Sequence, residues 1–199
     1  MNFKEPFPHT VLDNFLSPEV IRLVNCEWPL NGWVKENGKA QTKWNTCHLP
    51  KTAQQVVESI SVGLVEKVTG INNLFPDLDS MYGAGLHSVP SGGYLNMHVD
   101  FNRHPMGWWR RVNLLLYLNE NWNPEWGGDL LLGAKREKRI SPVAGRCVIF
   151  ETNEQSWHGH PEPLQCPQDR ERRSIALYFY TKEPPENPAR DHTTIYTKR

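Results

Sequence analysis

The sequence predicts a mainly β protein, a barrel-like β-sandwich supported by helices. Two observations predict this fold class. After Pro76 the chain becomes a run of short apolar segments separated by glycine and proline turns, which is typical of antiparallel strands. Before that point, apolar residues recur at helical spacing. The 199 residues suit a single domain, residues 1–199, with helical support over about 1–75 and a β core over about 80–182.

Two helices are expected in the first third. Ser17, Pro18 and Glu19 supply a capping hydroxyl, a proline for the first helical position and an acid for the first turn. A second helix is predicted from about Thr52 to Val68, because its apolar residues fall on one face and Gly70 follows as a terminator.

The β core is predicted from seven apolar segments and the turns between them. Turn signals lie at 90–93, 126–128 and 142–145, each with at least one glycine. The tail from Pro184 to Pro188 carries three prolines and is predicted to be irregular. The expected strands are Met81–Val89, Tyr94–Asp100, Arg111–Leu118, Gly128–Leu132, Ile140–Ser141, Arg146–Glu151 and Arg172–Tyr180.

Charge and composition argue against two classes of partner. Lysine plus arginine and aspartate plus glutamate both number 22, so no net charge points to nucleic acid or a membrane surface. No stretch approaches the ~18 apolar residues of a spanning helix, and the N-terminus has no apolar signal core. The four cysteines are scattered without a C-x-x-C pair, which favours reduced thiols. We therefore expect a soluble cytoplasmic protein.

A candidate metal site lies in the β core. His98 and Asp100 are two residues apart on a predicted strand, so both side chains point to the same side. His158 follows a strongly apolar strand sixty residues later. Two imidazoles and a carboxylate on one metal leave open coordination positions, which suits non-haem Fe(II) oxygen chemistry. His104 and His160 are competing ligands.

A candidate carboxylate-binding face lies on the last long strand. Arg172 and Ser174 alternate with Arg173, so one face pairs a guanidinium with a hydroxyl, a good receptor for an organic acid. On the neighbouring strand, Tyr117 shares a face with Arg111, Asn113 and Leu115, and its hydroxyl could donate a second bond to the same acid. Arg173 remains the alternative if the strand faces the other way.

These motifs together resemble a known family. Five segments are similar, in the same order along the chain, to segments of the prolyl 4-hydroxylase-like branch of the Fe(II)/2-oxoglutarate-dependent oxygenases. They are Tyr94–Asp100, Arg111–Asn119, Trp126–Leu130, Trp157–His160 and Arg172–Leu177. The resemblance covers roughly residues 81–182. It implies a double-stranded β-helix (jelly-roll) core.

The resemblance also implies the cofactors and the roles of the site residues. Fe(II) would be held by His98, Asp100 and His158, and the distal carboxylate of 2-oxoglutarate by Arg172 with help from Tyr117 and Ser174. O2 is the other co-substrate, and ascorbate could support turnover. No catalytic residue beyond the metal ligands is expected.

The implied reaction is hydroxylation of an unactivated C–H bond, of a prolyl or other residue in a peptide or protein. The alternatives are a free amino acid or small metabolite as substrate, or a non-catalytic jelly-roll module that binds a metal, an organic acid or a sugar. The loop 101–110 is expected to border the pocket mouth. Its Trp108 and Trp109 would either contact substrate or cover the barrel end. The oligomeric state is not predicted.

Overall fold

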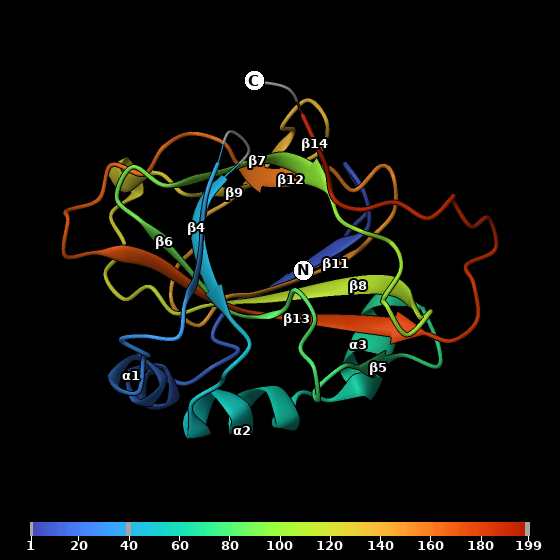
Figure 1. Ribbon diagram of the computed structural model, residues 1–199, viewed down its shortest axis with the longest axis horizontal. Coiled ribbons are helices and arrows are strands. Elements are labelled where there is room, and N and C mark those ends of the chain that lie inside the picture. The colour runs from blue at the N-terminus through green and yellow to red at the C-terminus, as the bar shows by residue number, and fades with distance from the viewer. Residues whose placement is uncertain (1, 39–40, 198–199) are drawn as a thin grey trace.

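The protein is built on one curled sheet, as the computed structural model shows for residues 2–38 and 41–197 (Figure 1). The described residues form 14 strands that pair in antiparallel fashion, in the order β1-β2-β11-β8-β13-β6-β4-β7-β12-β9-β10, with β3, β5 and β14 beside this path. The mainly β fold class is therefore confirmed. The strands are β1 (Asn2–Phe3), β2 (His9–Leu12), β3 (Val34–Asn37), β4 (Gln41–Thr46), β5 (Phe75–Pro76), β6 (Gly85–Pro90), β7 (Tyr94–Val99), β8 (Trp109–Tyr117), β9 (Leu130–Leu132), β10 (Lys138–Ile140), β11 (Cys147–Glu151), β12 (His158–His160), β13 (Glu171–Thr181) and β14 (Ile195–Tyr196).

Curling of the sheet produces two facing layers. In Figure 1, β11, β8 and β13 form the lower layer, β7, β12 and β9 form the upper one, and β6 and β4 connect them along one side. This arrangement is the jelly-roll core that the sequence resemblance implies. It leaves an internal space between the layers, toward which one face of each strand is directed.

Three helices pack under the lower layer (Figure 1). The first, α1 (Pro18–Cys26), begins as predicted, with the Ser17 hydroxyl accepting from the Val20 amide at 3.3 Å. The predicted second helix is instead two helices, α2 (Lys51–Ser59) and α3 (Val62–Thr69). The break lies where Ser61 caps a new helix by accepting from the Leu64 amide at 3.2 Å.

The first third of the chain is not only helical support, which corrects the prediction. Strand β2 pairs with β11 and extends the lower layer. Strands β3 and β4 form a hairpin, and β4 also pairs with β6 and β7. The hairpin therefore becomes part of the wall around the internal space.

Strand β8 separates the apolar core from this space. Val112, Leu114 and Leu116 are fully buried and belong to the apolar cluster that also contains core residues of the helices. Leu115 and Asn113, on the opposite face, line the internal space. The alternation predicted for this strand is correct from residue 112 onward.

The predicted position of Arg111 on that inner face is wrong. Pairing of β8 with β13 shifts between Phe179 and Tyr180, so that Phe179 lies opposite Val112 and Tyr180 lies opposite Arg110. Arg111 is the extra residue of this bulge. The bulge turns Arg110 inward, and Arg110 lines the internal space in place of Arg111.

Two further observations bear on composition. All four cysteines are free, which confirms the predicted thiols. Among the described helices, none has the length and apolar character that crossing a bilayer requires.

Candidate active site

A cavity of about 350 Å³ lies between the two layers. We call it the central cavity. Its walls come from the long strands, the β3–β4 hairpin and the segment around β14. The polar residues that line it are Glu36, Gln41, Lys43, Asn45, Tyr82, His87, His98, Asp100, Arg110, Asn113, His158, His160, Arg172, Ser174, Tyr178, Thr194 and Tyr196.

At one end of the central cavity, His98, Asp100 and His158 form what we call the metal cluster. One ligand atom from each lies within 4.8 Å of the others. The Asp100 carboxylate is 3.6 Å from His98 Nε2 and 3.4 Å from His158 Nε2. The pairing of β12 with β7 sets His158 directly opposite His98, which brings two distant parts of the chain together.

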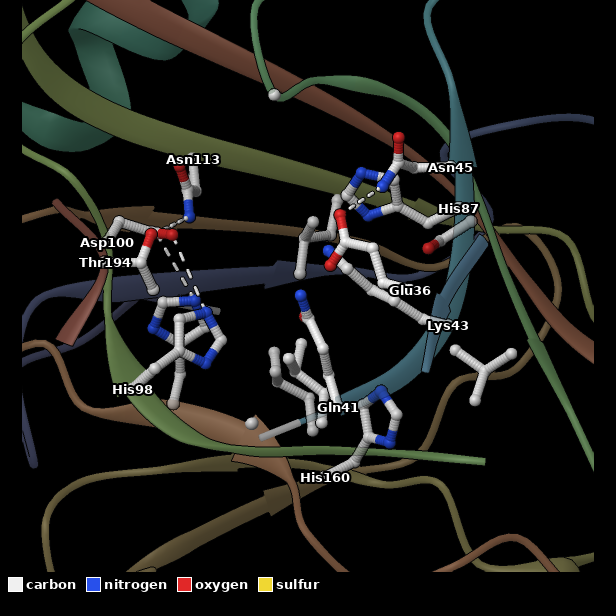
Figure 2. A pocket seen from close by; sticks show the side chains of 18 of the residues that line it. Glu36, Gln41, Lys43, Asn45, His87, His98, Asp100, Asn113, His160 and Thr194 are labelled. Carbon is white, nitrogen blue, oxygen red and sulfur yellow. Dashed lines mark hydrogen bonds and ion pairs between the residues drawn. The ribbon is translucent and has the colours of Figure 1, made fainter. Parts of the chain in front are cut away.

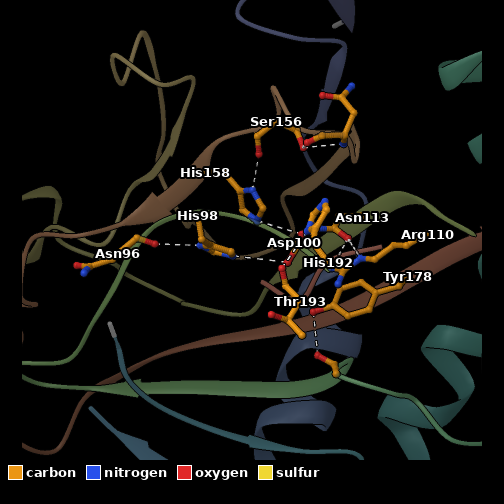
Figure 3. Close-up of polar contacts among 12 residues, drawn as sticks. Asn96, His98, Asp100, Arg110, Asn113, Ser156, His158, Tyr178, His192 and Thr193 are labelled. Carbon is orange, nitrogen blue, oxygen red and sulfur yellow. Dashed lines mark hydrogen bonds and ion pairs between the residues drawn. The ribbon is translucent and has the colours of Figure 1, made fainter. Parts of the chain in front are cut away.

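Backbone carbonyls orient both imidazoles. His98 Nδ1 lies 2.9 Å from the Asn96 carbonyl, and His158 Nδ1 lies 2.8 Å from the Ser156 carbonyl (Figure 3). With Nδ1–H donating to these carbonyls, each Nε2 keeps its lone pair for a metal. Burial and the neighbouring His98 imidazole lower the pKa of His158 to about 3, so this ring stays neutral, as a metal ligand must.

A buried arginine and an asparagine hold the carboxylate of the metal cluster. Asp100 Oδ2 accepts from Asn113 Nδ2 at 2.7 Å and lies 3.0 Å from Arg110 Nη2 (Figure 3). Arg110 also donates to Asn113 Oδ1 and packs over the Tyr178 ring, 3.4 Å from its centroid. Burial raises the pKa of Asp100, but Arg110 and the imidazoles outweigh burial and hold it well below its usual range.

The donor set fits Fe(II). Two imidazoles and one carboxylate converge, and each has a supporting hydrogen-bond partner of the kind that metal ligands have. Three protein ligands leave coordination positions for a bidentate organic acid and O2.

The competing histidines lie elsewhere. His104 is buried against Asp77, with Nε2 3.2 Å from the carboxylate, and its ring stacks on Trp108. His160 lines the central cavity but lies beside Leu95, further along β12 than His158. Neither belongs to the three-residue metal cluster found among the described residues.

A second polar centre lies on β13. Arg172 is buried, donating from Nε to the Gly128 carbonyl at 2.7 Å and from Nη2 to the Tyr117 hydroxyl at 3.2 Å. Ser174, two residues along the same face, is also buried and lines the central cavity. Gly128 has a positive φ of 78°, and a Cβ there would lie 3.1 Å from Arg172 Cδ, so glycine allows this close approach.

Arg173 lies on the opposite face of β13. Its guanidinium pairs with Glu171 at 2.7 Å and packs over the Trp28 ring. It is absent from the lining of the central cavity, whereas Arg172 is part of that lining. Of the two arginines, Arg172 is therefore the one placed to meet an acid inside the barrel.

The loop 101–110 borders the central cavity through Phe101 and Arg110. Its tryptophans do not line this cavity. Trp108 packs against Phe75 and His104, and Trp109 packs under Arg103. Both therefore contact side chains of the protein outside the lining of the central cavity.

Several cavity residues were missed by sequence reasoning. Arg110 is directed inward only because of the β8 bulge, which no local motif announces. Glu36 and Lys43 come from the hairpin in the supposed helical region. Tyr196 lies on β14, which pairs with β7, and its ring centroid is 5.4 Å from that of His98. The Asn37-Gly38 pair, a common hairpin-turn signal, was the available clue to the hairpin.

Comparison with known proteins agrees with the fold and the cluster. Residues 84–180 match the sequence model of the 2OG-Fe(II) oxygenase superfamily, and this segment contains the metal cluster and Arg172. No curated protein matches the chain significantly.

Solved structures share the fold at low sequence identity. A prolyl hydroxylase from Trichoplax adhaerens, in complex with a hypoxia inducible factor peptide fragment, superposes with a TM-score of 0.66 and 20% identity over 87% of this chain and 84% of the other. A prolyl-4-hydroxylase from Pseudomonas putida gives 0.60 and 19%, over 88% and 93% of the two chains. HygX from Streptomyces hygroscopicus, with nickel, 2-oxoglutarate and hygromycin B bound, gives 0.61 and 12%, over 89% and 84%.

The family match and the shared fold confirm the resemblance read from the sequence. The cofactors of this family are Fe(II) and 2-oxoglutarate. Residues 84–180 therefore carry the 2OG-Fe(II) oxygenase domain of a 2-oxoglutarate-dependent dioxygenase, in a fold that is shared with prolyl hydroxylases.

Proposed function

We propose that the enzyme hydroxylates an unactivated C–H bond of a prolyl or other residue in a peptide or protein. In this proposal His98, Asp100 and His158 hold Fe(II), and Arg172 binds the distal carboxylate of 2-oxoglutarate with help from Tyr117 and Ser174. The main observation in support of this proposal is that the metal cluster and the buried Arg172 line one cavity.

The residues of the chain bind and orient in this reaction. Bound together, Fe(II) and 2-oxoglutarate activate O2 for C–H oxidation, so we assign no protein acid or base. Arg172 would form a charge-assisted hydrogen bond to the co-substrate and so fix its direction. Leu115 and Leu130 line the cavity between the polar groups and would exclude water from the reacting atoms.

The size of the central cavity bears on the substrate. About 350 Å³ is near the lower end for small-molecule sites, so little more than one residue-sized group fits beside 2-oxoglutarate. A single side chain of a peptide meets this limit. The prolyl hydroxylases with the same fold support this choice.

A second candidate is a free amino acid or small metabolite. The β3–β4 hairpin and the segment around β14 both contribute residues to the wall of the central cavity, which could enclose a small molecule. HygX, with hygromycin B bound, has the same fold. The third candidate, a binding module without turnover, is distinguished from both by the experiment below.

The test is succinate formation from 2-oxoglutarate by the purified protein with Fe(II), ascorbate and air. Proline-rich peptides and free amino acids are added singly, and oxygenated products are identified by mass spectrometry. Succinate formation that is stimulated by a peptide, together with the hydroxylated form of that peptide, supports the proposal. Stimulation by free amino acids alone supports the second candidate, and ligand binding without succinate supports the binding module.

A further inference from the structure

The β3–β4 hairpin presents a row of polar side chains to the central cavity. Gln41, Lys43 and Asn45 alternate along β4 and line the cavity, and Glu36 lies opposite Lys43 in the antiparallel pair. We call these four residues the hairpin wall. Figure 2 shows it across the cavity from His98 and Asp100, with the ends of the Glu36, Gln41 and Lys43 side chains directed toward the middle.

Lys43 has no ionic partner in this wall. Among the described residues, no carboxylate lies within 4 Å of its ammonium group. Glu36, the nearest in register, accepts instead from Asn45 Nδ2 at 2.8 Å. Burial lowers the pKa of Lys43, while the Glu36 and Asp100 carboxylates counteract it. Lys43 is partly exposed and lines the central cavity, so its ammonium group is placed to attract an anion that enters the cavity.

The proposed partner of the 2-oxoglutarate carboxylate is Arg172, so Lys43 is not required for that role. Arg172 carries Tyr117 beside it, and the two lie on the lower layer with Ser174. Lys43 lies two strands away, beyond β6, on the wall that faces the metal cluster. An anion held there would lie in the same cavity as the metal cluster, across from His98 and Asp100.

We propose that Lys43 binds a carboxylate of the substrate, so that the enzyme acts on a group with a carboxylate close to the oxidised carbon. This inference rests on the proposed function of the same cavity. Two sources share this chemistry: an acidic residue next to the target in a peptide, or the α-carboxylate of a free amino acid.

The test measures binding without turnover. The full chain is loaded with Ni(II) and 2-oxoglutarate and titrated calorimetrically with three probes: L-proline, N-acetyl-prolyl-glutamate amide and its neutral glutamine counterpart. A lost charge-assisted hydrogen bond corresponds to roughly 10- to 100-fold in Kd. We expect the wild type to prefer one carboxylate probe over the neutral probe by at least about 10-fold, and the preferred probe identifies the source.

Matched variants locate the effect. Lys43→Met should abolish the preference and Lys43→Arg should restore part of it. Lys35→Met is the control, because Lys35 lies on the other face of the same hairpin, over the Trp44 ring. This control should keep the wild-type preference.

Three results would overturn the inference. The first is a wild type that shows no preference for a carboxylate probe, whether all probes bind alike or none binds. The second is a preference that survives Lys43→Met, and the third is a Lys43→Met variant that binds 2-oxoglutarate more weakly but keeps the preference. The proposed function fails separately. A carboxylate probe that binds through Lys43 but is never oxygenated with Fe(II) and air would retain the inference and count against hydroxylation.

Discussion

The two ends of the central cavity differ in how far the protein satisfies its own polar groups. At the metal cluster, both imidazoles and the carboxylate have partners that fix their orientation. On the side of the hairpin wall, Lys43 has no ion pair, and His87 Nε2 and His160 Nδ1 have no hydrogen-bond partner among the described residues. We infer that the first end is arranged to hold a metal ion, and that the polar groups of the second end are satisfied when a substrate binds.

The largest expected effect comes from removing the carboxylate at the prepared end. Asp100→Ala should abolish Fe(II) binding and succinate formation, and should lower the stability of the metal-free protein by about 3 kcal/mol or more because Arg110 is left buried and unpaired. Succinate assays and urea unfolding measure the two effects. Asp13→Ala, which removes a surface partner of Arg146, is the control. Retained succinate formation would contradict the metal assignment.

The two faces of β13 offer the next comparison. Arg172→Ala should raise the KM for 2-oxoglutarate by roughly 10- to 100-fold, because a buried charge-assisted hydrogen bond to the co-substrate is lost. Arg173→Ala should change it by less than about 2-fold, since its Glu171 pair is partly exposed. Steady-state kinetics measure the KM for 2-oxoglutarate in both variants. A larger increase in Arg173→Ala would mean that 2-oxoglutarate binds on the other face of β13.

The bulge on β8 offers a third matched pair. Arg110→Met should weaken binding of Fe(II) or Co(II) about 10-fold, as loss of an outer hydrogen-bond partner does at other metal sites. The pKa of Asp100 should rise, so the metal should be lost at a higher pH. Arg111→Met, which removes the neighbouring guanidinium outside the central cavity, should leave metal affinity unchanged. Equal losses in both variants would argue against a specific role for Arg110.

The last prediction concerns pH, and its effect per pH unit is small. The pKa of His158 is lowered to about 3 in the folded protein, chiefly by burial, and returns to about 6.5 on unfolding. The unfolded chain therefore binds one more proton between these values, and stability present above pH 6.5 is lost as the pH falls toward 3. The metal-free wild type should lose about 1.4 kcal/mol more per pH unit below 6 than His158→Gln. Parallel denaturation curves from pH 6 to 5 would refute this.

Local signals predicted the parts of the fold that depend on neighbouring residues. The start of α1 follows from the Ser17 cap, and the faces of β8 and β13 follow from strand alternation. The positions of His98, Asp100, His158 and Arg172 could be inferred because each is tied to a recurring motif.

Features set by tertiary pairing could not be predicted in the same way. The bulge that turns Arg110 inward exists only because β8 pairs with β13. The segment of β4 reads as polar and weakly patterned, and becomes a strand because β6 and β7 offer it free edges. The break between α2 and α3 depends on a serine cap overriding a continuous apolar face.

The placement of β4 across the sheet has a consequence for how such enzymes diverge. The metal cluster, Tyr117 and Arg172 are encoded within residues 84–180, whereas Glu36, Lys43 and Tyr196 lie outside that stretch. If Lys43 binds substrate as proposed, mutations in the outer stretches would alter substrate choice and leave the metal cluster and Arg172 unchanged. Libraries that vary only residues 34–46 and 194–196 would be the direct way to retarget this oxygenase.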